Sequence, residues 1–170
     1  MAHVRSASLW IRALGDCTLD GATDPGAEGT IRGNLQNAEG GQFWTDGSGT
    51  GQIAKILRRE RTIAAAATHN YNLLAAGSLT DIAGTAIDAD EMKGFELRCT
   101  SGSIKLVASA GTPIGLFLAA GDGVNVPNGC TIGVDWGTTG LDVTVNSLFE
   151  ITDTAGGAGS AYELWAVVAE

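Results

Sequence analysis

The sequence predicts an all-β protein, built as an antiparallel sandwich or barrel, from three observations. Glycine is unusually common, with 25 residues in a chain of 170, whereas proline occurs only 3 times. In the second half, short alternating or apolar runs recur about every 8–12 residues, with glycine-containing turns between them. Hydrophobic residues make up 44% of the chain and charged residues 17%, so the chain is apolar enough to bury one core in one domain.

Residues 1–52 are the least regular part of the sequence and predict an extended, turn-rich N-terminal arm. Residues 7–14 and 30–35 contain apolar or alternating runs that predict two strands. Asp-Gly, Asp-Pro-Gly and glycine-rich segments separate these strands from each other and from the rest of the chain. We therefore expect an arm over residues 1–52 that packs on a β-sandwich domain over residues 53–170, or on a neighbouring molecule.

The first part of the expected sandwich has a mixed pattern. Residues 62–63 and 68–73 look extended on either side of four alanines at 64–67, so we interpret them as strand, turn, strand. Ser78 is expected to open one helical turn, which Gly84 would end.

A clearer strand covers residues 92–99, in which Phe95 and Leu97 alternate with charged residues. Cys99, at its end, is expected to be a small buried side chain. Residues 103–107 return after a Ser-Gly turn, so the two segments are expected to pair as a hairpin.

Strand-like segments continue at a similar spacing to residue 168. They are residues 114–118, 124–126, 131–134, 141–145, 149–151 and 162–168. The last of them carries Trp165, which is expected to lie in the core. No repeat of fixed period is visible, which argues against a propeller or a solenoid.

The charge of the chain is strongly negative and unevenly distributed. A formal net charge of −9 makes binding to phosphate backbones unfavourable, so no nucleic-acid partner is expected. Residues 106–170 hold seven acidic residues and no Lys or Arg. Four of the ten basic residues instead form a basic cluster in the sequence: Lys55, Arg58, Arg59 and Arg61. The cluster is either a solvated face or a docking surface for an acidic partner or a neighbouring copy.

The chain lacks the residue patterns of common catalytic sites. It has two histidines, and because His3 lies at the N-terminus, a nucleophilic site would depend on His69. It contains no G-x-S-x-G, G-x-x-x-x-G-K or H-E-x-x-H motif. We therefore predict no enzymatic activity, no catalytic residues and no cofactor.

Metal binding and membrane insertion are not predicted either. The three cysteines are far apart, with no C-x-x-C pair, which argues against a zinc site. The apolar stretch at 106–120 contains glycine and proline and is shorter than a membrane span. Calcium binding is left open for an acidic series in the arm that does not have EF-hand spacing and is otherwise explained as turn-forming: Asp16, Asp20, Asp24 and Glu28.

Two of the four tryptophans, Trp44 and Trp136, lie beside glycines in expected loops. An exposed loop tryptophan marks an interface or a platform on which a sugar stacks. Partial burial under the loop is an equally good interpretation of the same pattern.

An ordered series of segments spans residues 44–168. The segments are WTDGSGTGQ at 44–52, RTIAA at 61–65, YNL at 71–73, GSLTD at 77–81, MKGFEL at 92–97, VNVPNG at 124–129 and AYELWAVV at 161–168. In this order they resemble a family of small virion proteins encoded by tailed bacteriophages and prophages. The cysteines and residues 1–43 do not belong to the resemblance.

The resemblance implies a jelly-roll-like β-sandwich that decorates or cements a capsid from the virion exterior, after synthesis in the host cytoplasm. The implied partners are the major capsid protein and further copies of the chain, in a homo-oligomer for which a trimer is favoured over a dimer. The alternative function is a carbohydrate-binding or adhesive β-sandwich module, as part of a tail or fibre.

Partner binding is expected to involve the apolar start of the arm, the two loop tryptophans and the basic cluster. The candidate residues are Leu9, Trp10, Ile11, Trp44, Lys55, Arg58, Arg59, Arg61 and Trp136.

Overall fold

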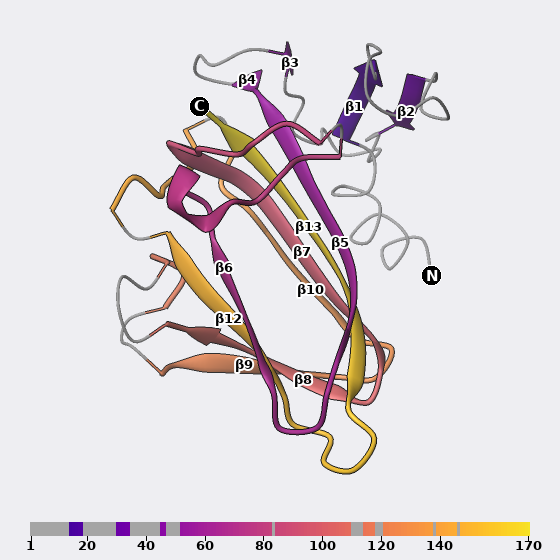
Figure 1. Ribbon diagram of the computed structural model, residues 1–170. Coiled ribbons are helices and arrows are strands. Elements are labelled where there is room, and N and C mark those ends of the chain that lie inside the picture. The colour runs from indigo at the N-terminus through magenta and orange to yellow at the C-terminus, as the bar shows by residue number, and fades with distance from the viewer. Residues whose placement is uncertain are drawn as a thin grey trace.

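Over the residues that it describes, the computed structural model is all-β apart from one short 3-10 turn, and its two main sheets are antiparallel (Figure 1). The expectation of an all-β sandwich is therefore confirmed. The structure describes residues 14–18, 30–34, 45–46, 52–82, 84–109, 114–117, 121–137, 139–145 and 147–170.

The first sheet has the order β10-β7-β13-β5, and a short strand, β11, also pairs with β7. Its strands are β5 (Lys55–Ile63), β7 (Glu91–Ser101), β10 (Thr131–Asp135), β11 (Leu141–Asp142) and β13 (Ser160–Ala169).

The second sheet has the order β6-β12-β8-β9. Its strands are β6 (Thr68–Asn72), β8 (Ser103–Ala108), β9 (Gly123–Pro127) and β12 (Leu148–Asp153).

Among the described residues, four short strands precede β5. They are β1 (Leu14–Thr18), β2 (Thr30–Asn34), β3 (Thr45–Asp46) and β4 (Gln52–Ile53). β1 pairs with β2 in antiparallel orientation, whereas β3 pairs with β4 in parallel orientation. Most of residues 1–52 lie outside the described residues, so their interpretation as an arm stays a prediction.

Strand pairing in the two main sheets follows a nested pattern. β5 pairs with β13, β6 with β12, β7 with β10 and β8 with β9, and every pair is antiparallel. The chain therefore resembles one long hairpin that has been folded over on itself into two layers. Among the described residues, β5 and β6 each pair with one strand of their sheets, so both are edge strands.

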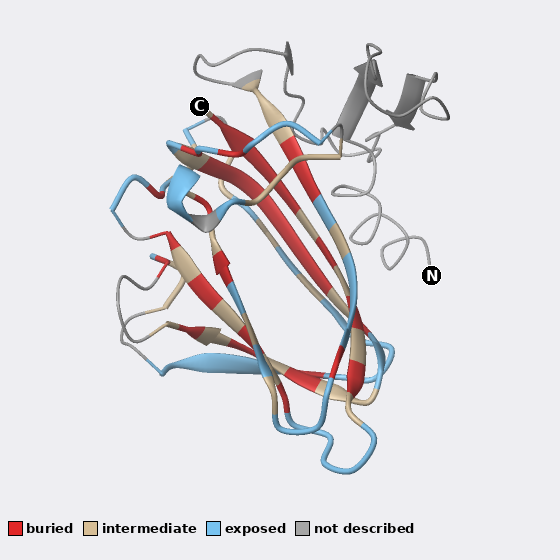
Figure 2. Cartoon of the chain, viewed as in Figure 1, coloured by how far each residue is buried: buried red, intermediate tan, exposed pale blue. Residues whose placement is uncertain are grey.

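The alternating sequence pattern explains why the two sheets face each other. In β8 and β12, every second residue is buried, because side chains along a strand point to opposite faces. Figure 2 shows buried residues along both sheets. Phe149 of β12 links the layers. Its ring stacks on that of Tyr71 of β6, with the ring centroids 5.0 Å apart, and stands nearly perpendicular to that of Phe95 of β7, with the centroids 5.8 Å apart. The core is thus a continuous aromatic and aliphatic layer between the sheets.

The expected hairpin of residues 92–99 and 103–107 is wrong. These segments form β7 and β8, which belong to different sheets, and the chain crosses from one layer to the other at Gly102. Gly102 has a φ of +75°, which favours glycine, and an added Cβ would lie 2.3 Å from Ser160 Oγ. Two strands that pair in one sheet and two strands that face each other across a core show the same alternation of apolar and polar residues. The alternation therefore cannot tell which of these two arrangements the strands adopt.

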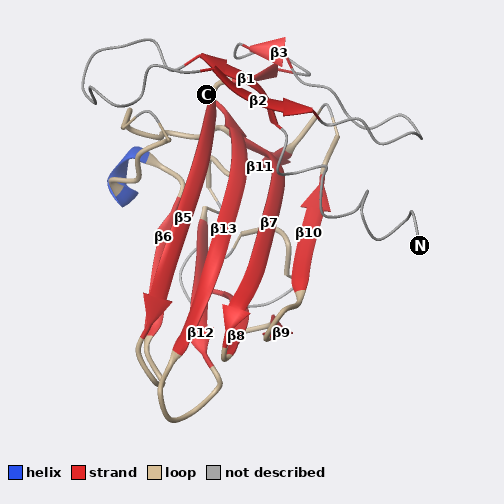
Figure 3. Ribbon diagram, turned by 90° about the vertical axis from the view of Figure 1, so that its right-hand side faces the viewer, coloured by secondary structure: helices blue, strands red, loops and turns tan. Residues whose placement is uncertain are grey.

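Two smaller expectations are also corrected. Trp165 lies half-buried on the outer face of β13, where Arg58 is 5.0 Å from its ring, because its neighbours Leu164 and Ala166 point into the core. The helical turn expected from Ser78 is a 3-10 turn over Ala75–Gly77, drawn as a short helix in Figure 3, and Ser78 ends it with a φ of +52°.

A buried carboxylate joins the turns at one end of the sandwich. Asp153, 5% exposed, accepts hydrogen bonds from the Ala66 backbone N–H at 3.0 Å and from the Ser160 hydroxyl. Its own N–H donates to the Ala67 carbonyl at 3.0 Å. These bonds hold the pKa of Asp153 below its usual value, the Ser160 hydroxyl contributing most and the Ala66 N–H next.

Removal of the Phe149 ring should destabilise the protein strongly. Phe149→Ala deletes a fully buried ring that contacts both sheets, so the free energy of unfolding should fall by about 3–5 kcal/mol in urea denaturation. Val145→Ala, at a side chain that is 68% exposed, should change it by less than about 0.5 kcal/mol. Equal effects of the two substitutions would contradict the assigned core.

Candidate functional site

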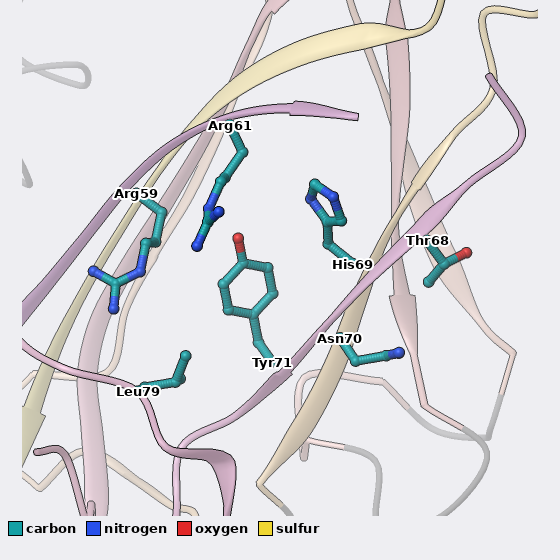
Figure 4. Close-up of a pocket in the computed structure, with 7 residues that line it drawn as sticks. All are labelled: Arg59, Arg61, Thr68, His69, Asn70, Tyr71 and Leu79. Atoms are coloured by element: carbon teal, nitrogen blue, oxygen red, sulfur yellow. The ribbon is translucent and has the colours of Figure 1, made fainter. Parts of the chain in front are cut away.

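A pocket of about 360 Å³ opens between the edge strands β5 and β6, where the two sheets meet the solvent. Figure 4 shows its lining side chains. They are Arg59, Arg61, Thr68, His69, Asn70, Tyr71 and Leu79. We call it the Arg59–Arg61 pocket.

The period of the two edge strands places these side chains. On β5, Leu57 and Ile63 are buried, and Arg59 and Arg61 share their face of the strand between them. On β6, His69 and Tyr71 share the inner face. Figure 4 shows these two residues and the two arginines around one space, whereas Thr68 and Asn70 point away from it.

The two arginines differ in how they are held. Arg59 donates hydrogen bonds to the Thr80 carbonyl at 2.7 Å and to the Arg58 carbonyl at 2.8 Å. Burial lowers the pKa of Arg59 and the positive charge of Arg61 lowers it further, whereas Tyr71 and the Asp81 carboxylate act in the opposite direction. Arg61 is exposed and makes no hydrogen bond or ion pair with any residue that the structure describes.

A chain of hydrogen bonds links two lining residues of the pocket, His69 and Tyr71, to the buried Tyr162, and we call these three residues the floor of the pocket. The Tyr162 hydroxyl lies 2.7 Å from His69 Nδ1 and 2.7 Å from the Tyr71 hydroxyl. Burial raises the pKa of Tyr162, and the bond to Tyr71 raises it further. Burial and then the charge of Arg61 lower the pKa of His69. The floor is therefore neutral at pH 7, and the two guanidinium groups give the pocket a positive charge suited to an anion.

The basic cluster does not form one patch. Arg58 lies on the outer face of β5, over Trp165 and paired with Glu60. Lys55 forms an ion pair with Glu170 at 2.5 Å and donates to the Ala86 carbonyl. Only Arg59 and Arg61 enter the pocket. Arg58 points to the opposite face of the strand, whereas Lys55 lies on the same face but is held by Glu170 outside the pocket lining.

The other candidate residues fall in different places. Trp136 follows β10, packs partly buried against the core, and donates its backbone N–H to the Lys93 carbonyl at 3.0 Å. The remaining candidates lie outside the described residues: Leu9, Trp10, Ile11 and Trp44.

The acidic series considered for calcium falls mostly outside the described residues. Three of its members lie there, and the side chain of the fourth, Asp16, is not described. Among the side chains that the structure does describe, no group of three or more His, Cys, Asp or Glu is placed to hold a metal ion. In the same part of the chain, no helix is long and apolar enough to cross a membrane.

Sequence reasoning identifies only part of the pocket and misses its aromatic floor. His69 stands out as the one histidine away from the N-terminus, but nothing in the sequence singles out Tyr71 or Tyr162. Tyr162 is 93 residues from His69 in the chain, and no local pattern links them. The inward face shared by Arg59 and Arg61 is the one local signal of the pocket.

Comparisons with known proteins identify no family. No protein-family model and no curated protein matches the sequence. One similar solved structure comes from work on Bacillus endospore appendages, which form a family of disulfide-linked pili. It is 15% identical, with 74% of this chain and 98% of that chain covered, and the TM-score is 0.29. At this TM-score the likeness supports no statement about fold or function.

The lowered pKa of His69 predicts how stability depends on pH. The ordinary value is 6.5, so at and somewhat below pH 6.5 the unfolded chain binds more protons at this residue than the folded chain. The contribution is fully present well above pH 6.5, and the free energy of unfolding should fall as the pH drops through 6.5 toward the lowered pKa of His69 in the folded chain. Asp142 and Asp153, whose pKa values are lowered from 3.8, titrate below this window.

His69→Gln should flatten this pH dependence in urea denaturation series, because the glutamine keeps a hydrogen-bonding group but does not titrate. Asn70→Gln, which changes the next residue of β6 without removing a titrating group, is the matched control and should keep the wild-type slope. A slope in His69→Gln equal to that of the wild type would contradict the assignment.

Proposed function

We propose that this chain is a virion structural protein with a jelly-roll fold that decorates and stabilises the capsid of a tailed phage. The observation that carries the proposal is the nested pairing of eight strands. Counted along the chain from β5 and without β11, the first strand pairs with the eighth, the second with the seventh, the third with the sixth and the fourth with the fifth. This winding is characteristic of jelly rolls, which are frequent in viral capsid proteins.

The family resemblance supports the same proposal from the sequence. Its segments span residues 44–168 and include the last strand of the sandwich, β13. Jelly rolls also occur in lectins, which is the basis of the carbohydrate-binding alternative. Trp136, one of the two tryptophans behind that alternative, packs against the core, so only part of its ring is open to a sugar.

The proposed partners are the major capsid protein and further copies of this chain, with a trimer favoured over a dimer. In this proposal the N-terminal arm reaches a neighbouring subunit and buries its apolar residues there, at about 25 cal/mol per Å² of apolar surface. Part of that gain is offset by the entropy lost on association. The sandwich serves as a rigid body outside the shell, and its negative charge keeps particles apart.

Capsid binding by the full chain tests the proposal. Purified protein should pellet with capsids of the phage that encodes it, and light scattering should detect an oligomer of the free protein. Simultaneous substitution of Leu9, Trp10 and Ile11 by alanine should weaken capsid binding at least about tenfold, because buried aromatic anchors dominate such interfaces.

The matched control is Val145→Ala, an apolar truncation at an exposed position of the sandwich, which should bind capsids as the wild type does. Unfolding curves of each variant establish that the sandwich is intact. A strictly monomeric protein that does not bind capsids would overturn the proposal, and glycan binding by that protein would favour the carbohydrate-binding alternative.

A further inference from the structure

The Arg59–Arg61 pocket brings together two positive charges without an acidic lining residue. Neither Asp nor Glu is among its seven lining residues. Arg59 is anchored on the Thr80 carbonyl, so its guanidinium is fixed in place. Arg61, two residues along the same face, has no hydrogen-bond or ion-pair partner among the residues described. A negative group between them would relieve the repulsion of like charges.

A carboxylate fits the chemistry of this space. Guanidinium groups bind carboxylates through two parallel hydrogen bonds, which are stronger than bonds between neutral groups. In Figure 4 the Tyr71 hydroxyl points toward Arg61 and His69 lies beside it, so both are placed to contact the same ligand. Leu79 gives the pocket an apolar wall against which the methylene groups of an acidic side chain would pack.

The edge of β5 indicates that the carboxylate belongs to a polypeptide. The Ile56 carbonyl accepts a hydrogen bond from the Ile82 N–H and so points away from β13. Backbone groups of alternate residues point the same way, so those of Glu60 and Thr62 also point away from β13. Their N–H and C=O groups therefore face the open edge of β5 beside the pocket. Since β5 pairs only with β13 among the described residues, an extended segment has room to add there as a further strand.

We propose that the Arg59–Arg61 pocket binds an acidic side chain of an extended polypeptide segment that pairs with the edge of β5. The partner's identity rests on the proposed function, in which the capsid subunit supplies this segment. The carboxylate site itself is a property of the isolated protein and is tested without capsids.

The probe is a blocked five-residue peptide with a central glutamate, compared with the same peptide carrying a central glutamine. Binding is followed by NMR through the ring signal of His69, and the ring of His3, the other histidine of the chain, serves as the internal reference. The glutamate peptide should shift the His69 signal to saturation, and the glutamine peptide should bind at least about tenfold more weakly.

Two variants on one strand separate the pocket from general charge effects. Arg61→Gln changes an exposed residue that makes no described contact, and it should weaken binding of the glutamate peptide at least about tenfold. Arg61→Lys should weaken this binding less. Arg58→Gln removes the same charge from the outer face and should bind within about twofold of the wild type.

Equal binding of the two peptides, or equal loss in Arg58→Gln and Arg61→Gln, would overturn the inference. Tighter binding of free glucuronate than of the glutamate peptide would overturn the polypeptide occupant in favour of an acidic sugar. Capsid binding that is unchanged by Arg61→Gln would overturn the capsid subunit as the partner at this pocket but leave the proposed function intact. A peptide-binding pocket in a protein that binds no capsid would support the site and reject the proposed function.

Discussion

The Asp153 carboxylate is the junction on which one end of the sandwich depends. It accepts from the turn between β5 and β6 through Ala66, and from the start of β13 through Ser160. Ser160 in turn accepts the Ser103 N–H at 2.9 Å, so the first residue of β8 is attached to the same group. A buried carboxylate is stable only when its oxygens are hydrogen-bonded, and here each bond comes from a different segment of the chain.

That junction also sets the geometry of the pocket between the same two strands. Because the turn at Ala66 fixes where β5 ends and β6 begins, it fixes which residues of the two edge strands lie opposite each other. Arg61 therefore lines the same pocket as His69 and Tyr71. The carboxylate thus holds the turn that joins the two strands lining the pocket, without itself being one of the lining residues.

Sequence patterns predict the individual strands better than the relations between them. The alternation in Leu148–Asp153 identifies a strand with one buried face, and the structure agrees. It does not identify which strands become neighbours, because that depends on the fit of whole layers, and the predicted pairing of β7 with β8 is wrong for this reason. The predicted place of Trp165 is wrong because the run from Leu164 to Val168 is apolar at every position. The charged Glu163, on the same face as Trp165, is the one residue nearby that marks the outer face.

The residues of the candidate site can likewise be predicted from the sequence only in part. Arg59 and Arg61 can be found because charge clusters are visible in a sequence, and a period of two then separates them from Arg58. Tyr162 cannot be found in this way, since its place beside His69 depends on the pairing of the first long strand with the last.

The pairing of β5 with β13 has a consequence for how the chain folds as it is made. Lys55 pairs with Val168, so β5 leaves the ribosome long before its partner has been synthesised. Until then the side chains of Leu57 and Ile63, which are fully buried in the finished protein, lack the core that they pack into. Such distant contacts slow folding and prolong the exposure of apolar edges to other nascent chains. Efficient assembly of this protein in a crowded cell therefore depends on shielding β5 during synthesis as much as on the stability of the final sandwich.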